Sequence, residues 1–155
     1  MRETEAYRPM VRFLDSEVTK HFTTELATNA GESEDIDGLV CNGIVINTVI
    51  IQSKENRDWD LYFYRTTGQD DTDLDLDKFV EMVHFDAEFG KQIAGSGQFY
   101  YNWSSLNIPY KDDDMLCKLH LKLVNRSTAS KSADAAGVVK VSIVYEPDGG
   151  KPGGV

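Results

Sequence analysis

Two segments near the C-terminal end of the chain alternate apolar and polar side chains. Residues 117–123 read CKLHLKL, and residues 139–143 repeat the pattern as VKVSI. Successive side chains of a β-strand point to opposite faces, so each segment predicts a strand with one buried and one solvated face. Because such strands must bury one face against another layer, this feature predicts a protein built from packed sheets.

Other segments extend the same interpretation along the chain. Strands are predicted at residues 17–28, 39–51, 59–64, 79–85 and 98–103, with turn residues between them. Residues 39–51 are almost continuously apolar, which is typical of a strand buried on both faces, and Gly43 marks a bend or bulge. Residues 29–38 are polar and predict a loop. Six to eight short strands without a long helix predict an all-β fold, an antiparallel β-sandwich that is jelly-roll-like.

The length of 155 residues suits one domain with a single core. We expect an N-terminal arm at residues 1–15, a β-sandwich domain at 16–146 and a flexible tail rich in Gly and Pro at 147–155. The chain has no apolar run long enough to span a bilayer and no signal peptide. The expected location is therefore the cytoplasm, or a virion.

The net charge of −10 restricts the partners of the protein. Binding to nucleic acid or to an anionic membrane requires a basic face, and the sequence shows none, so neither partner is expected. Residues 55–90 carry much of the acidic excess. This region is either a surface for cations or basic partners, or a solvated face that keeps the protein soluble.

A run of aspartates offers a candidate metal site. Its members are Asp70, Asp71, Asp73, Asp75 and Asp77. Closely spaced carboxylates can supply the oxygen ligands that calcium requires, so calcium is the possible cofactor, although the EF-hand pattern is absent. Alternation of aspartate with apolar residues also fits an edge strand with an acidic outer face.

The remaining acidic residues and the histidines suggest no catalytic site. The run 112–114 predicts a solvated turn, and Asp35 could join either acidic cluster in space. His21, His84 and His120 are isolated in the sequence, and His120 is expected on the surface of its strand. Without metal-ligand or nucleophile motifs we expect no enzymatic activity.

The two cysteines of the chain, Cys41 and Cys117, fall inside predicted strands. They fit either one disulfide or two buried thiols, and the apolar surroundings favour thiols.

Aromatic residues give a candidate binding face. Tyr62 and Tyr64 alternate with core positions of one predicted strand, and Tyr100 and Asn102 lie on another. Outward tyrosines beside polar side chains can stack on a sugar or anchor a protein interface. The competing interpretation is that these rings fill or rim the sandwich.

The last third of the chain resembles small β-sandwich virion proteins of tailed phages, which include capsid-decoration and accessory proteins. The likeness involves LNIPY at residues 106–110, KLH at 118–120, LVNRS at 123–127 and YEP at 145–147. It implies a non-enzymatic structural protein that acts by self-assembly or by contact with a protein partner. The alternative hypothesis is a carbohydrate-binding β-sandwich module, with a glycan as ligand and calcium in the Asp-rich run.

Overall fold

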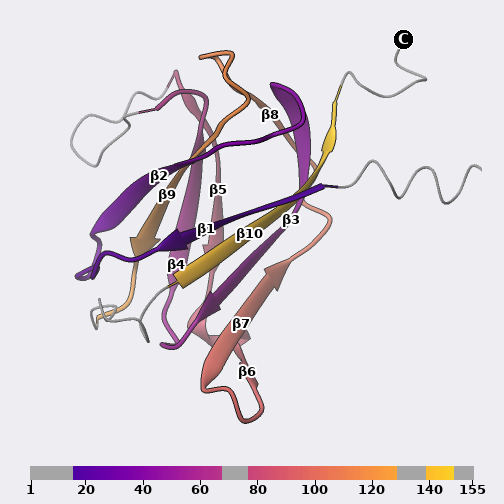
Figure 1. Ribbon diagram of the computed structural model, residues 1–155. Coiled ribbons are helices and arrows are strands. Elements are labelled where there is room, and N and C mark those ends of the chain that lie inside the picture. The colour runs from indigo at the N-terminus through magenta and orange to yellow at the C-terminus, as the bar shows by residue number, and fades with distance from the viewer. Residues whose placement is uncertain (1–15, 68–76, 129–138, 149–155) are drawn as a thin grey trace, which may run out of the picture.

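The computed structural model describes residues 16–67, 77–128 and 139–148, and it is built from β-strands (Figure 1). One short 3-10 helix, η1 (Ala87–Phe89), interrupts them. The strands are β1 (Ser16–Phe22), β2 (Gly31–Ile36), β3 (Gly43–Ser53), β4 (Trp59–Tyr64), β5 (Phe79–Phe85), β6 (Lys91–Ile93), β7 (Gln98–Trp103), β8 (Ile108–Lys111), β9 (Leu119–Asn125) and β10 (Val139–Pro147). No helix in these three ranges is long and apolar enough to cross a membrane.

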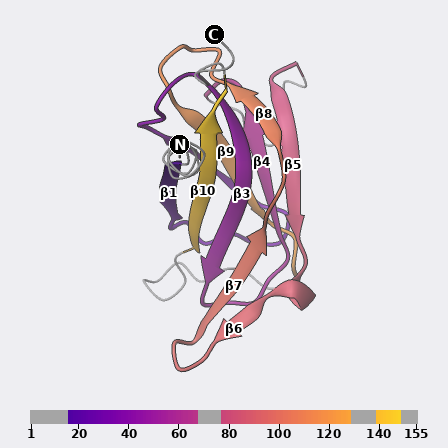
Figure 2. The same ribbon diagram turned by 90° about the vertical axis from the view of Figure 1, so that its right-hand side faces the viewer.

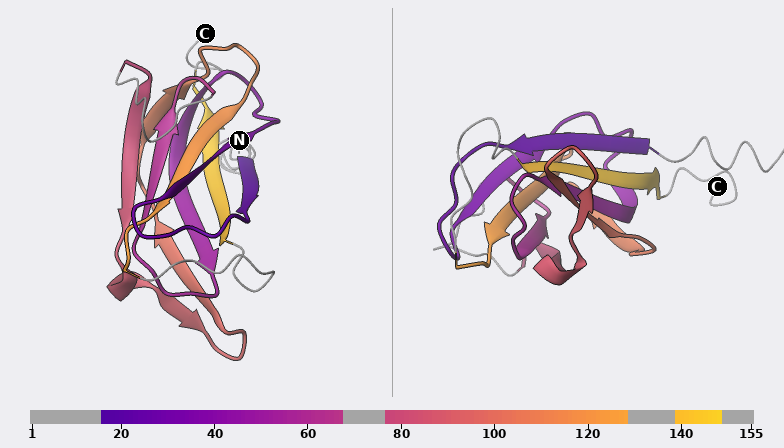
Figure 3. Two further views of the ribbon diagram at one scale, coloured as in Figure 1. Left: turned by 90° about the vertical axis from the view of Figure 1, so that its left-hand side faces the viewer. Right: turned by 90° about the horizontal axis from the view of Figure 1, so that it is seen from below.

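The strands form two antiparallel sheets that pack face to face (Figures 1 and 2). The first sheet has the order β1-β10-β3-β7-β6, with β8 also paired to β3, and the second has the order β2-β9-β4-β5. Strands from the two halves of the chain pair in a nested way, β1 with β10, β2 with β9, and β3 with β7 and β8, around the central hairpin β4-β5. This nesting is that of a rolled-up hairpin, so the predicted jelly-roll β-sandwich is confirmed. In the end-on view of Figure 3, β1 and β10 lie side by side.

The core lies between the sheets and follows the period-two pattern. In β9, Leu119, Leu121 and Leu123 point inward and are almost completely buried. They pack with the inward residues of the facing sheet, such as Ile51 and Val141. Fully burying each such side chain contributes about 1.5–3 kcal/mol, so alternation in the sequence fixes which face of each strand turns inward.

A bulge in β3 explains the continuous apolar run at residues 39–51. Ile46 pairs with Tyr145 and Thr48 with Val144, so Asn47 is the extra residue. An inserted residue shifts the alternation by one, which lets apolar side chains on both sides of the bulge enter the same core. The predicted irregularity therefore exists, but it lies at Asn47 and not at Gly43.

The bulge also divides the neighbouring strand. Strand β7 pairs with the second half of β3 and β8 with the first half. Between them, the N–H of Leu106 donates to the carbonyl of Asn47 (2.9 Å).

Three predictions about the strands were wrong. Ten strands form where six to eight were expected, because β6 and β8 are short pieces that alternation cannot reveal. Residues 31–36 are strand β2 and not part of a loop, since their polar side chains lie on a sheet edge that pairs with β9. The first predicted strand ends at Phe22, well before residue 28. The predicted arm at 1–15 and residues 149–155 of the predicted tail lie outside the described residues.

Candidate functional site

An apolar groove runs along the edge of the sandwich between β5 and β7. It consists of two adjoining hollows of about 290 and 440 Å3 that share Phe89 and Trp103. The hollows are lined by Glu81, Met82, Val83, His84, Phe85, Asp86, Phe89, Lys91, Tyr100, Tyr101, Asn102, Trp103, Leu106 and Ile108. We call this surface the edge groove. Figure 2 shows β5 and β7 facing the viewer at this side of the sandwich.

The edge groove exposes large apolar side chains. Phe89 is 68% exposed and Trp103 is 46% exposed, and Met82 adds further apolar surface. Trp103 comes two residues after Tyr101 in the inward alternation of β7, but Tyr101 is buried whereas Trp103 is exposed. Its indole Nε1 donates to the carbonyl of His84 (2.7 Å), so it links the edges of the two sheets. Contiguous exposed aromatic and apolar side chains of this kind are typical of an interaction site.

Two of the four predicted binding residues line this groove. Tyr100 and Asn102 point outward from β7, and the Asn102 amide donates to the Tyr100 hydroxyl (3.0 Å). The Ser104 hydroxyl donates to the Asn102 carbonyl (2.7 Å). The polar atoms of this pair therefore already hydrogen-bond to one another, while the rings beside them stay open.

The other two, Tyr62 and Tyr64, lie on the outer face of the second sheet. Their rings stack with centroids 6.4 Å apart, and Tyr64 is only 2% exposed, so the expectation that it is exposed was wrong. Arg126 donates to the Tyr62 hydroxyl and, through Nε, to Asp60 (2.7 Å). Burial alone would lower the pKa of Arg126, but these two bonds outweigh it and raise that pKa. The structure thus separates the four predicted binding residues into two places, and their role in binding stays a prediction.

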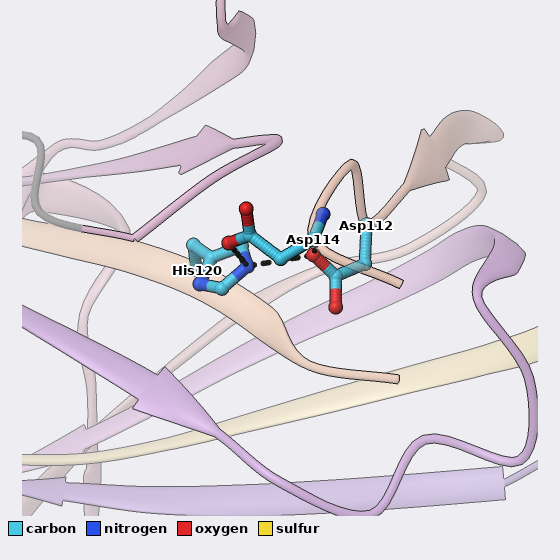
Figure 4. Close-up of side chains that lie close together, drawn as sticks. All are labelled: Asp112, Asp114 and His120. Carbon is cyan, nitrogen blue, oxygen red and sulfur yellow. Dashed lines mark hydrogen bonds and ion pairs between the residues drawn. The ribbon is translucent and has the colours of Figure 1, made fainter. Parts of the chain in front are cut away.

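A second cluster of polar side chains lies at the end of the sandwich where the β2-β3, β4-β5 and β8-β9 connections meet. His120 projects from the outer face of β9 and is only 3% exposed, and Asp112 in the β8-β9 loop is fully buried. Figure 4 shows both beside Asp114. The prediction of a surface histidine was wrong, and the predicted solvated turn is correct for the exposed Asp113 and Asp114 but wrong for Asp112. His120 is buried on this outer face because Asp35 of the neighbouring strand β2 and Asp112 of the β8-β9 loop lie against its ring.

Each ring nitrogen of His120 faces a carboxylate. Nδ1 lies 2.8 Å from Asp35 Oδ1, and Nε2 lies 2.9 Å from Asp112 Oδ1. A carboxylate only accepts hydrogen bonds, so both ring nitrogens must donate, which requires the positively charged imidazolium. Burial alone would lower the pKa of His120, but the bonds to Asp35 and Asp112 outweigh it and raise the pKa.

Asp112 organises the loop that carries it. Its carboxylate also accepts the backbone N–H groups of Asp114 (3.0 Å), Leu116 (3.0 Å) and Lys118 (2.9 Å). Burial alone would raise the pKa of Asp112, but the bonds from His120 and from these N–H groups outweigh it and lower the pKa. Tyr110 closes the cluster. Its hydroxyl donates to the Lys118 carbonyl (2.9 Å), and burial raises its pKa.

The cluster has the ligand types of a metal site but not the geometry of one. One ligand atom each of Asp112, Asp114 and His120 lies within 4.8 Å of the others. A metal-bound histidine must present a nitrogen lone pair, whereas both nitrogens of His120 are spent on hydrogen bonds to carboxylates. We therefore interpret the arrangement as a buried ion pair that ties strands β2 and β9 to the β8-β9 loop.

One of the five predicted calcium ligands, Asp77, is among the described residues, and it is not part of this cluster. Asp77 lies in the turn before β5 and is exposed, and Asp70, Asp71, Asp73 and Asp75 lie outside the described residues. Calcium binding by this run stays a prediction.

The cysteines are two free thiols, each half-buried. Both lie in loops, so the prediction of thiols is confirmed and their placement inside strands was wrong. The Cys41 thiol donates to the Gly43 carbonyl (2.9 Å).

Comparison with known proteins gives fold-level likenesses only. No protein-family model and no curated protein sequence matches the chain. Among solved structures, the coat protein dimer of Tobacco streak virus is 10% identical, with 87% of each chain covered and a TM-score of 0.38. A second crystal form of that coat protein is 12% identical, with 90% of each chain covered and a TM-score of 0.36. The VP2 subviral particle of infectious bursal disease virus is 15% identical over 90% of this chain and 34% of VP2, with a TM-score of 0.37.

Proposed function

We propose that this protein is a non-enzymatic structural protein that works through contacts with other proteins, as a component of a virus particle in a capsid-decoration or accessory role. The observation that carries this proposal is the edge groove, where Phe89 and Trp103 expose aromatic surface to solvent. Burying such surface releases about 25 cal/mol per Å2, which makes it a natural contact for another protein. Jelly rolls of this topology serve as building blocks of viral capsids, although they also serve as lectins.

A second apolar surface supports a role in assembly. Val40, Met115 and Leu116 are each more than half exposed on loops at the end that carries the Asp112–His120 cluster. Two separate apolar surfaces on one small domain suit a protein that contacts more than one neighbour.

The chemistry of the groove favours a binding role over a catalytic one. His84 is paired with Asp60 beside the groove, as a general base would be. However, the described lining of the groove contains no serine, threonine or cysteine to act as a nucleophile. His120 is buried, is held in its protonated form by Asp35 and Asp112, and lies outside the groove.

The native mass of the protein tests the assembly proposal. We expect light scattering after size exclusion to give a discrete oligomer whose mass falls at lower concentration. Phe89→Asp should weaken it, because a charge then lies on the apolar contact. Thr23→Asp is the control, since it adds a negative charge at an exposed position outside both apolar surfaces. If neither the mass nor binding to virus particles responds to Phe89→Asp, the edge groove is not the contact.

Carbohydrate binding is the second candidate, favoured by Tyr100, Asn102 and Trp103 side by side in the groove. A sugar needs both an aromatic ring to stack on and polar groups to hydrogen-bond. The Asn102 amide and the Tyr100 hydroxyl already hydrogen-bond to each other, so a sugar would have to compete with that bond. A glycan panel decides the matter: binding that Tyr100→Ala abolishes would support this function, with Tyr62→Ala as the control on the other sheet.

A further inference from the structure

Strand β5 forms one edge of the second sheet, since it pairs with β4 alone. The indole of Trp103 donates to the carbonyl of His84, so the main chain of His84 points away from β4. The N–H and C=O of one strand residue point to the same side, and this side alternates along the strand. Met82, two residues earlier, therefore also turns its N–H and C=O toward the open edge.

The open N–H of Met82 is held by a side chain. It donates to Oε1 of the neighbouring Glu81 (3.0 Å), so this carboxylate takes the place that a carbonyl of an added strand would occupy. Both residues are exposed and line the edge groove. A strand that docks here would receive the hydrogen bond from Met82 and free the Glu81 carboxylate to pair with a cation.

The charges around the groove indicate what kind of strand fits. Glu81, Asp86 and Glu88 lie on β5 and η1 beside it, and Lys91 is the cation on its far side. A docking strand should therefore be basic, with apolar side chains for the hollows beside Phe89 and Trp103. A second copy of β5 does not meet this requirement, because two Glu81 carboxylates would then face each other.

A segment that is not part of any described strand has the required chemistry. Residues 6–14 read AYRPMVRFL, which combines Arg8 and Arg12 with five large apolar side chains and has no carboxylate, in a chain of net charge −10. The segment lies outside the described residues. We infer that the β5 edge of one copy binds residues 6–14 of a second copy by β-strand addition, with the arginines matched to the groove carboxylates. This inference rests on the proposed assembly function and names its contact.

The position of the segment in the chain favours a second copy over the same one. Leu14 precedes β1 by two residues, which span at most about 7 Å of extended chain. Strand β1 lies at the opposite edge of the sandwich from the groove, as Figure 2 shows. Three strand spacings separate β1 from β7 in their sheet, or about 14 Å. Phe13 and Leu14 are therefore too close to β1 to reach the groove of their own copy, so binding of the whole segment requires the groove of a neighbour.

Full-length variants test the inference through the mass of the oligomer in sedimentation velocity. We expect Glu81→Arg, Met82→Pro and the double variant Arg8→Glu/Arg12→Glu each to raise the dissociation constant at least about tenfold, the loss typical of a disrupted charged contact. Proline at an edge position removes the N–H without breaking the sheet, and unchanged circular dichroism checks this. Arg2→Glu and Glu25→Arg, both outside the contact, should leave the constant unchanged.

A mixing experiment provides the stronger test. Glu81→Arg and the Arg8→Glu/Arg12→Glu variant should each associate poorly alone and regain association when mixed, because one copy's groove then meets the other's segment with opposite charge. A synthetic peptide of residues 6–14 should compete with the wild-type oligomer, and a scrambled peptide should not. If the wild type forms an oligomer and none of these substitutions changes its dissociation constant, this inference is wrong, and assembly through another surface remains. A wild-type protein that stays monomeric and binds neither the peptide nor virus particles overturns both.

Discussion

Replacing Asp112 with asparagine tests whether the buried cluster ties strands β2 and β9 to the β8-β9 loop. The substitution keeps the size of the side chain but removes its charge and turns one oxygen into a donor. In the protein each carboxylate oxygen accepts two bonds, Oδ1 from Asp114 N–H and His120, and Oδ2 from the N–H groups of Leu116 and Lys118. An asparagine amide in either orientation places its NH2 group against two donors.

The expected cost follows from these contacts. Two buried donors lose their acceptor, at about 1–3 kcal/mol each. Breaking a buried ion pair from one side costs about 3–5 kcal/mol, because His120 keeps its charge without this partner. These two costs describe overlapping contacts of one network and do not add. We expect Asp112→Asn to lower the free energy of unfolding by about 3–5 kcal/mol, a large part of the roughly 5–15 kcal/mol of a typical domain. For a chain of this length the melting temperature should fall by roughly 6–20 °C.

Urea unfolding followed by tryptophan fluorescence measures this, because Trp59 is fully buried in the core. The transition should move to lower urea with an unchanged slope. Asp113→Asn is the matched control: Asp113 is the next residue and is exposed, and it pairs with Lys78 (3.2 Å) and Arg65 (3.8 Å) at the surface. Its loss should cost about 0–1 kcal/mol. If the two variants lose the same stability, the interpretation of Asp112 as a buried organiser is wrong.

Three further predictions follow from the same contacts. The pKa of His120 is raised above its ordinary value of 6.5. The stability that charged His120 gives the folded protein is therefore fully present below pH 6.5 and is lost as the pH rises through the raised pKa. In melting curves recorded over this pH range, His120→Gln should not show this loss. Arg126→Lys should destabilise the protein by about 1–2 kcal/mol in urea, because lysine cannot reach Asp60 and Tyr62 together, whereas Arg65→Lys at the exposed pair should change little. If the aspartates of residues 70–77 bind calcium, saturating calcium should raise the melting temperature and a chelator should reverse it; a temperature indifferent to both would end that prediction.

Alternation of side chains was sufficient to predict the layers of the fold. In β9 the leucines at 119, 121 and 123 point inward as their spacing predicts, and the same holds for Val139, Val141 and Ile143 of β10. These positions follow from a local rule, the period of two along a strand, which needs no knowledge of neighbours. The order of the strands in each sheet is a property of pairing between distant segments, and a single sequence does not contain it.

The buried ion pair was unpredictable for the same reason. His120 occupies a polar-face position, where a local pattern predicts exposure, and its burial depends on the two carboxylates that lie against its ring. Its partners Asp35, in strand β2, and Asp112, in the β8-β9 loop, are 85 and 8 residues away in the chain. The run 112–114 contained a usable signal, since aspartate frequently bonds to backbone N–H groups of its own loop, but it could not show which of the three is buried.

The edge groove owes its shape to the bulge at Asn47, and this limits how it can be tested. At the bulge, the strand that pairs with β3 changes from β7 to β8. This break places Leu106 and Ile108 beside Trp103, the last residue of β7. The floor of the groove is thus the side of the core itself, and Ile108 is only 7% exposed. Substitutions on that floor would lower stability by the cost of a core cavity, whatever the groove binds. Phe89 is 68% exposed at the rim of the groove, so a substitution there can remove a binding contact without opening the core. A variant of this residue that loses association but keeps its stability is therefore the decisive result.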